Sequence, residues 1–152
     1  MPRTQRGSQL RIGRYSEAGR IYLLTSVTHD RRPLFSDWRL GRLVASEFRK
    51  AEQEGRTRTL AWVVMPDHFH WLTELKTGSL GPLMRRVKSG SSRSIVAAGA
   101  GPLQIWQKGY HDRALRRDED ILRTARYIVA NPLRAGLVHR IGDYPLWDAV
   151  WL

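Results

Sequence analysis

Residues 57–75, TRTLAWVVMPDHFHWLTEL, decide the fold of this chain. Two β-rich apolar runs surround a short turn at residues 65–67, a pattern typical of a β-hairpin. His68 and His70 begin the second run, and side chains two positions apart on a strand point to the same face of the sheet. The stretch therefore predicts a hairpin that presents two imidazoles side by side.

The paired imidazoles allow two interpretations. His68 and His70 can bind one divalent ion together, because neutral imidazole is a common metal ligand. Alternatively, each can be a buried histidine that forms hydrogen bonds within the core. A strand of Val, Phe and Trp has no packing need for two adjacent imidazoles, so we favour the metal site. The chain has no cysteine, which excludes disulfides and thiolate ligands.

The composition predicts one domain with a polyanionic partner. A chain of 152 residues with 41% hydrophobic residues is long enough for a single buried core. Its net charge is +12, and 22 of its 26 basic residues are arginine, since only four are lysine. No acidic residue occurs between Lys76 and His111, whereas an ordinary soluble surface mixes both signs. Arginine suits bidentate contact with phosphate, so we favour a nucleic acid partner over a merely solubilising surface.

Apolar spacing predicts the remaining helices and strands. In the second helix the apolar stripe leaves Arg85, Arg86 and Lys88 facing outward, and the polar segment SGSSRS at 89–94 argues against the helix continuing. The expected strands are 21–28, 57–64, 68–75 and 105–110; the expected helices run from Asp37 to Gly55, onward from Gly81-Pro82, and from near Asp118 to Asn131-Pro132.

The order strand, helix, strand, strand, helix, strand predicts an α+β fold, the ferredoxin-like split βαβ sandwich with an antiparallel sheet. We expect a basic N-terminal arm at 1–20 and a single domain at 21–152. Its C-terminal tail, about 140–152, carries Tyr144, Trp147 and Trp151 and should pack back on the body. Without a signal peptide or a membrane-spanning run, we expect a soluble cytoplasmic protein, associated with the nucleoid through its partner.

A tyrosine in the last long helix lies away from the apolar stripe. At about 100° per residue, Tyr127 falls opposite that stripe and on the same side as Arg123, Thr124 and Asn131. Residues four apart on a helix meet, so the Tyr127 phenol and the Asn131 amide are presented together. The same pattern also fits a surface tyrosine that fills the rim of the core, and by itself it does not decide between the two.

Together with the histidines, Tyr127 makes chemical sense as a nucleophile. A tyrosine hydroxyl can attack a phosphodiester, and the resulting phosphotyrosine preserves the bond energy for religation. A neutral phenol is a weak nucleophile unless a cation assists it. His68 and His70 would supply part of a site for Mg²⁺ or Mn²⁺, which needs at least one oxygen ligand, and Asn131 could provide that oxygen.

Three blocks of the chain, VVMPDHFHWL, WQKGYHDRALR and RYIVANPLRAGLV, resemble the single-tyrosine HUH transposases, specifically the REP-associated tyrosine transposases. The resemblance runs from about Ile21 to Val138, with the blocks in the family's order. It implies an HUH-type ferredoxin-like fold, a Mg²⁺ or Mn²⁺ requirement, and cleavage of single-stranded DNA at REP hairpins through a 5′-phosphotyrosine intermediate. A monomer is favoured, although relatives of the insertion-sequence type form dimers.

The resemblance also implies roles for individual residues. His68 and His70 correspond to the metal pair, Tyr127 to the nucleophile and Asn131 to the third ligand. His111 is a candidate accessory acid, base or phosphate contact, although such a residue also commonly holds a loop. The arm resembles a region that reads a short guide sequence. The candidate DNA-binding residues are Arg11, Arg14, Arg85, Arg86, Lys88, Arg93, Arg116, Arg117 and Arg123.

Two other functions remain as alternatives. The first is a ferredoxin-like REP or nucleic-acid-binding protein without catalysis, for which the histidines and the tyrosine would be dispensable. The second is a metallohydrolase that uses the HxH pair without the tyrosine. The chain lacks the HExxH motif and the HxE with paired cysteines, so this second alternative is the weakest.

Overall fold

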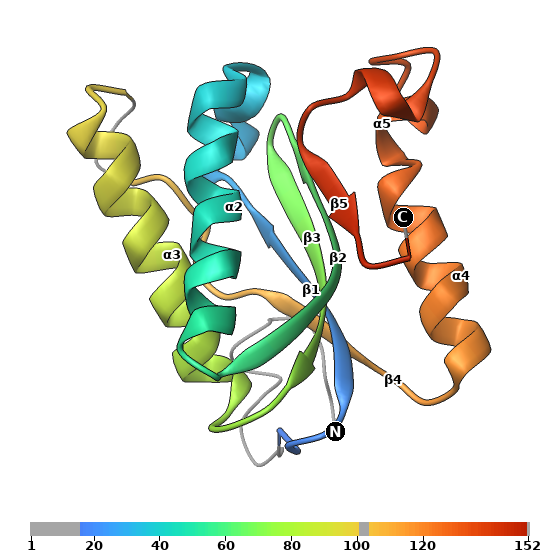
Figure 1. Cartoon of the computed structure of the whole chain (residues 1–152). Helices are drawn as coiled ribbons and strands as arrows, with labels where there is room; N and C mark the ends of the chain where they lie inside the picture. Colours follow the sequence, from blue (N-terminus) through green and yellow to red (C-terminus); the bar gives the residue numbers. More distant parts are fainter. Residues whose placement is uncertain (1–15, 101–103, 152) are drawn as a thin grey trace.

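The computed structural model describes residues 16–100 and 104–151 and places the predicted hairpin at the centre of an antiparallel sheet (Figure 1). The order of the five strands is β4-β1-β3-β2-β5. The first four strands of the chain have the arrangement of the ferredoxin-like fold, so the predicted fold class is confirmed. The strands are β1 Ile21–Val27, β2 Thr57–Met65, β3 His68–Leu75, β4 His111–Leu115 and β5 Trp147–Ala149.

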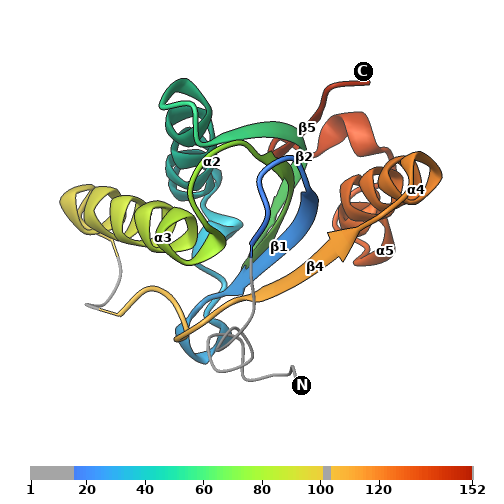
Figure 2. The same ribbon diagram turned by 90° about the horizontal axis from the view of Figure 1, so that it is seen from below.

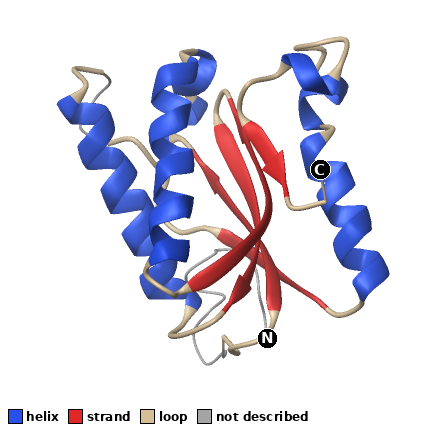
Figure 3. Ribbon diagram, in the orientation of Figure 1, coloured by secondary structure: helices blue, strands red, loops and turns tan. Residues whose placement is uncertain are grey.

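Helices cover both faces of this sheet and give three layers, as Figures 1 and 3 show. Helices α2 (Trp38–Gln53) and α3 (Leu80–Ala97) lie on one face, and α4 (Asp118–Val129) and α5 (Asn131–Arg134) lie on the other. The view from below in Figure 2 shows the same separation, with α4 and α5 on the side opposite α3. Three short 3-10 turns complete the described part of the chain: η1 His29–Arg31, η2 Leu34–Ser36 and η3 Ile141–Asp143. Within the described residues, no helix is both long and apolar enough to cross a bilayer.

The side chains of β3 point alternately to the two faces of the sheet, and they contribute to a separate hydrophobic core on each face. Phe69 and Trp71 point toward α2, where the Phe48 ring stacks on Trp71 at 4.5 Å between centroids and meets Phe69 edge-on at 5.1 Å. Leu72 points the other way and packs in a second core with Ala125 and Ile128 of α4. Burial of each large apolar side chain stabilises the fold by about 1.5–3 kcal/mol, so both faces of β3 hold it in place.

Helix α2 confirms its predicted start and end. The Asp37 side chain accepts a hydrogen bond from the Arg39 N–H at 3.1 Å, which satisfies one of the free donors of the first turn. The chain leaves the helix at Gly55, whose φ of +76° is costly for residues with a side chain. The buried stripe between these ends contains Val44 and Phe48.

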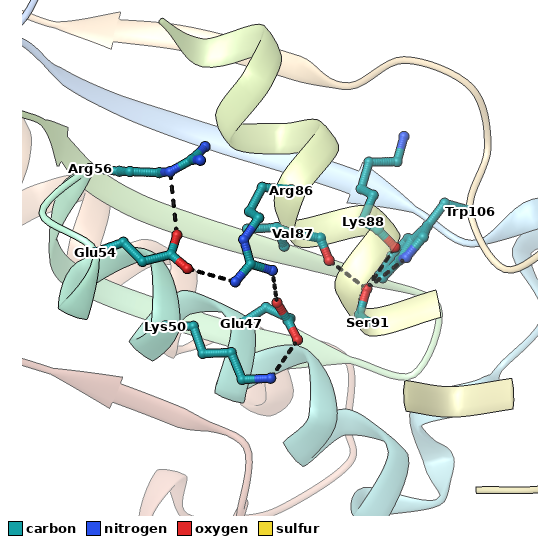
Figure 4. A network of polar contacts seen from close by, with 9 residues as sticks. All are labelled: Glu47, Lys50, Glu54, Arg56, Arg86, Val87, Lys88, Ser91 and Trp106. Carbon is teal, nitrogen blue, oxygen red and sulfur yellow. Dashed lines mark hydrogen bonds and ion pairs between the residues drawn. The ribbon is translucent and has the colours of Figure 1, made fainter. Parts of the chain in front are cut away.

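Helix α3 continues to Ala97, so the expected end before the SGSSRS segment is wrong. The small residues of this segment serve packing, because Gly90 and Ser91 are both buried. The Ser91 hydroxyl donates to the carbonyl of Val87, one turn earlier, and accepts a hydrogen bond from the Trp106 indole. Figure 4 shows these contacts beside an ion-pair network that joins α2 to α3.

The outward orientation expected for Arg86 and Lys88 is also wrong. Arg86 is half-buried, and its guanidinium pairs with the buried Glu47 at 3.2 Å and with Glu54 at 2.7 Å (Figure 4). Lys88 donates through Nζ to the carbonyls of Gln107 at 2.8 Å and Gly109 at 2.6 Å. Burial lowers the pKa of Lys88 to about 8. Both side chains therefore tie α3 to its neighbours.

The expected strand at 105–110 lies elsewhere in the structure. Ile105 and Trp106 are buried, but Trp106 forms only an isolated bridge with Thr28, and the edge strand β4 follows at 111–115. The apolar side chains of 105–110 are buried by packing, with the Phe35 and Trp106 ring centroids 5.5 Å apart. Edge strands tolerate charged residues, which is why HDRAL gave no apolar signal.

The C-terminal segment adds the strand that the sequence did not predict. Strand β5 pairs with β2, and Trp147 donates through its indole to the Ile141 carbonyl. The Tyr144 hydroxyl donates to the carbonyl of Val64 at 2.6 Å. Trp151 remains 46% exposed, so packing of the tail is confirmed for the first two aromatic residues and wrong for the third.

Close approach of α2 and α3 at Gly90 gives a stability test. A methyl group at Gly90 would overlap the Glu47 carboxylate, which is buried and held by Arg86 and Lys50. We expect Gly90→Ala to lower the free energy of unfolding by about 2 kcal/mol, measured by chemical denaturation. The control Gly81→Ala, in the same helix with open space around it, should be neutral or stabilise by up to about 1 kcal/mol. Equal effects of the two substitutions would contradict this account.

Candidate metal and nucleophile site

Both imidazoles lie on the face of the sheet that carries α4. The centroids of the His68 and His70 rings are 5.0 Å apart, with the ring planes at 75°. His70 is paired in register with Thr25 of β1 and Val63 of β2, in the middle of the sheet. Strand alternation thus places the rings side by side, as predicted.

Each imidazole uses one ring nitrogen for a hydrogen bond within the protein. The Nδ1 atom of His68 lies 2.7 Å from Oδ1 of Asp67, and the Nδ1 atom of His70 lies 2.8 Å from the Thr25 hydroxyl. When each Nδ1 carries the proton and donates it to these oxygens, each Nε2 keeps a free lone pair. Such hydrogen bonds fix the tautomer and the ring orientation of a metal ligand.

Asp67 is itself held in place by Arg31. The Arg31 guanidinium donates to Oδ2 of Asp67 at 3.0 Å, while Oδ1 faces His68. Although burial raises it, the pKa of the Asp67 carboxyl is held below its ordinary value by hydrogen bonds from His68 and Arg31. Arg31 and its neighbour Asp30 have φ values of +50° and +57°, a backbone conformation that L-residues seldom adopt. The strained turn thus presents Arg31 to the carboxylate behind the His68 ring.

Helix α4 presents Tyr127 to solvent, as predicted, with 61% of its surface exposed. Its neighbour Thr124 is buried, so its expected place on the polar face is wrong. The helix breaks at Ala130, and Asn131 begins α5 with Pro132 in its first turn. Proline therefore starts a second short helix after ending the first.

Arg134 connects α4 with α5, and no sequence motif predicted a role for it. Its guanidinium carbon lies 3.7 Å from the centroid of the Tyr127 ring, and its Nη2 donates to Oδ1 of Asn131 at 3.2 Å. Its charge is close enough to His70 to help lower the pKa of that imidazole. One side chain thus contacts both the tyrosine and the amide. Arg134 follows Asn131 by three residues and Tyr127 by seven. On a helical wheel this spacing places all three side chains on one side, and it could have identified Arg134 as their neighbour.

The remaining candidate residues divide into four groups. His111 is exposed on β4 and lies opposite Thr25, which lies opposite His70, so all three share one face of the sheet. Arg86 and Lys88 are engaged in the contacts between elements described above. Arg11 and Arg14 lie outside the described residues. The exposed candidates are Arg85 and Arg93 on α3, Arg116 and Arg117 before α4, and Arg123 on α4.

The donor set fits a small divalent cation. The two imidazoles stand side by side on one strand and are of the nitrogen-ligand type, and the Asn131 amide is of the oxygen-donor type, that such a cation accepts. Among the residues that the structure describes, no three His, Cys, Asp or Glu side chains are arranged so that they could hold a metal ion together. A full site would therefore need Asn131 or water oxygens beside the imidazoles, and Mg²⁺ and Mn²⁺ accept such ligands.

Comparison with known proteins places the chain among transposases. It belongs to the family described as transposase IS200-like, whose model matches residues 19–131. A REP-associated tyrosine transposase of Escherichia coli K12 is 30% identical over 87 residues, which cover 56% of this chain and 50% of the relative. The "Putative REP-associated tyrosine transposase" of Haemophilus influenzae Rd is 25% identical over 146 residues, covering 84% of this chain and 78% of the relative. The match thus spans half the length of the E. coli protein.

A solved structure supports the same fold. The structure of a REP-associated tyrosine transposase bound to a REP hairpin superposes with a TM-score of 0.74 at 23% identity. The match covers 97% of this chain and 82% of the other. The resemblance inferred from the three sequence blocks is therefore confirmed at the level of family and fold.

The half-buried His70 should titrate well below an ordinary histidine. Burial, helped by the charges of His68 and Arg134, lowers its pKa from 6.5 to about 4. Between these values the unfolded chain binds a proton that the folded protein does not, so the free energy of unfolding falls as the pH decreases. We expect this group to lower the free energy of unfolding by roughly 3 kcal/mol in total as the pH falls. NMR of the imidazole measures the pKa, and denaturation at each pH measures the stability. The His70→Gln variant should lack this contribution. A His70 ring that titrates near 6.5 would contradict the prediction.

The Asp67 carboxylate should affect metal affinity without being a required ligand. Asp67→Ala removes the oxygen that faces Nδ1 of His68, so we expect Mn²⁺ to bind about 10- to 100-fold more weakly in calorimetry. Asp67→Asn keeps an accepting oxygen and should lose less. Glu119→Ala, which removes an exposed carboxylate from the first turn of α4, is the control for charge and should leave the affinity unchanged.

Proposed function

We propose that this protein cleaves and rejoins single-stranded DNA through Tyr127. The observation that supports this best is the Arg134 side chain, which contacts both the Tyr127 ring and the Asn131 amide and whose charge reaches His70. Family membership as an IS200-like transposase supports the same chemistry. The exposed phenol is accessible to a polymer as large as a DNA strand.

The reaction is a transesterification at phosphorus. The Tyr127 oxygen attacks the scissile phosphate, a bond from that oxygen to phosphorus forms, and the bond to the 3′ oxygen of the preceding nucleotide breaks. The phenol loses its proton to solvent or a nearby base, and the leaving 3′ oxygen takes up a proton. The product is a 5′-phosphotyrosine and a free 3′ hydroxyl. Attack by a 3′ hydroxyl reverses the step and restores a phosphodiester.

His68, His70 and Asn131 would hold the cation. When bound, Mg²⁺ or Mn²⁺ polarises the scissile phosphate and offsets the negative charge that develops on it. The chain's own contribution is orientation: Asp67 and Thr25 hold the two rings so that each Nε2 faces away from its hydrogen-bonded partner. His70 needs no deprotonation at neutral pH, because burial already keeps it neutral.

Exposed arginines and the REP hairpin of the relatives suggest the substrate. We propose that Arg85, Arg93, Arg116, Arg117 and Arg123 contact phosphates, together with Arg11 and Arg14 of the arm, and that the DNA is single-stranded with a REP hairpin. We also propose an accessory contact with the DNA for His111, supported by its position on the face of the sheet that carries the histidine pair. We propose a monomer as the active form, in the cytoplasm and at the nucleoid.

Substitution of the nucleophile tests the proposal. Tyr127→Phe removes only the attacking oxygen from an exposed side chain, so the fold and the affinity for a REP oligonucleotide should be unchanged. Wild-type protein with Mn²⁺ should give a covalent tyrosyl–DNA species on a denaturing gel, and Tyr127→Phe should give none. The wild-type species should disappear with EDTA.

Two results would decide against the proposed chemistry. A Tyr127→Phe variant that cleaves at the wild-type rate would exclude Tyr127 as the nucleophile. Wild-type protein that binds the oligonucleotide but never forms an adduct would instead favour the non-catalytic REP-binding function. Tyr22→Phe is a matched control: this hydroxyl is buried in the α2–α3 core and accepts a hydrogen bond from the Glu17 N–H, so adduct formation should persist.

A further inference from the structure

Arg134 follows Asn131 by one helical turn and Tyr127 by two. Because α5 begins immediately after the break at Ala130, all three side chains meet on the exposed side of the two helices. The guanidinium stacks on the phenol ring at 3.7 Å and donates to the Asn131 oxygen at 3.2 Å. A guanidinium has five donors in one plane and is always charged, so it can make both contacts at once.

The end of a helix alone does not account for these contacts. A basic residue in the last turn interacts favourably with the helix dipole and with free carbonyls, which would explain an arginine at this position. It would not explain why the guanidinium lies on the nucleophile's ring or why it occupies the Asn131 oxygen. That oxygen is the one that the proposed function assigns to the metal.

We propose that Arg134 is a positioning residue that holds Tyr127 and Asn131 together before metal binding and competes with the cation for the Asn131 oxygen. This inference rests on the proposed function. In this structure the Arg134 guanidinium already donates to the Asn131 oxygen that the cation would use. Its contacts are exposed and therefore weak, so they can be exchanged.

Competition predicts an unusual combination of effects. A positive charge near the imidazoles disfavours a dication, and the hydrogen bond to Asn131 must be shared or broken when the amide turns to the ion. Removal of Arg134 should therefore strengthen metal binding. The same removal should slow DNA cleavage, because the phenol ring loses the contact that orients it. A residue that only stabilises the fold would weaken both.

Arg134→Gln tests this combination, because it removes the charge and the planar fork of donors while leaving an unbranched polar side chain. We expect Mn²⁺ to bind about three- to tenfold more tightly in calorimetry at neutral pH without DNA. At saturating Mn²⁺, the rate of tyrosyl–DNA adduct formation should fall by about tenfold or more. Arg134→Lys keeps the charge but not the planar donor set, so Mn²⁺ affinity should stay near the wild-type value while the adduct rate falls.

Arg140→Gln is the matched control, since Arg140 is an exposed arginine six residues further on that pairs with Asp143. It should change neither quantity. Weaker Mn²⁺ binding by Arg134→Gln, or no change in either affinity or rate, would overturn the role of Arg134. Wild-type protein that forms no adduct would overturn the proposed function instead, and the Mn²⁺ affinities of the Arg134 variants would still decide whether Arg134 competes with the ion.

Discussion

The strict alternation of β3 fixes both the hydrophobic core and the candidate site. Phe69 and Trp71 pack against α2, and the same pleat turns His68 and His70 to the opposite face. A slip of one residue in the pairing would exchange the two sets and place imidazoles in an apolar core. The backbone N–H groups of Thr28 and Phe35 donate to the carbonyls of Asp67 and Pro66 and so anchor the turn before β3.

The two halves of the site differ in how firmly they are held. The imidazoles stand on the central strand and are oriented by Asp67 and Thr25. Tyr127, Asn131 and Arg134 contact one another on the exposed side of α4 and α5, and Ala125 and Ile128 anchor the buried side of α4. The imidazoles are thus held by partly buried hydrogen bonds, whereas the Tyr127 and Arg134 side chains are exposed and can adjust.

Local signals in the sequence were sufficient for the hairpin, β1 and α2. The turn at 65–67, the Asp37 cap and the apolar spacing of α2 act over a few residues, and the structure has each of them. The site residues on these elements could be found because strand and helix periodicity alone determine their faces. Tyr127 and Asn131 were likewise accessible from the helical period.

What the sequence did not reveal depends on contacts between distant segments. The SGSSRS segment remains helical because Gly90 and Ser91 fit against α2 and Trp106. The apolar residues among 105–110 are buried against α3 and β1, so their pattern resembles that of a strand. The edge strand that does form, β4, carries charged residues instead. Strand β5 exists only because β2 offers an edge to it. Arg134 is one of many arginines until the break at Ala130 brings it to Tyr127.

The last strand also has a consequence for how the chain matures in the cell. Leu146 lies against Gly41 of α2 in the first core, and Trp147 and Ala149 pack in the second, so one short segment joins both layers. During synthesis this segment follows every other helix and strand described. Until it emerges, the nascent protein carries an uncovered β2 edge and two incomplete interiors, the kind of surface that chaperones recognise and that neighbouring nascent chains can pair with.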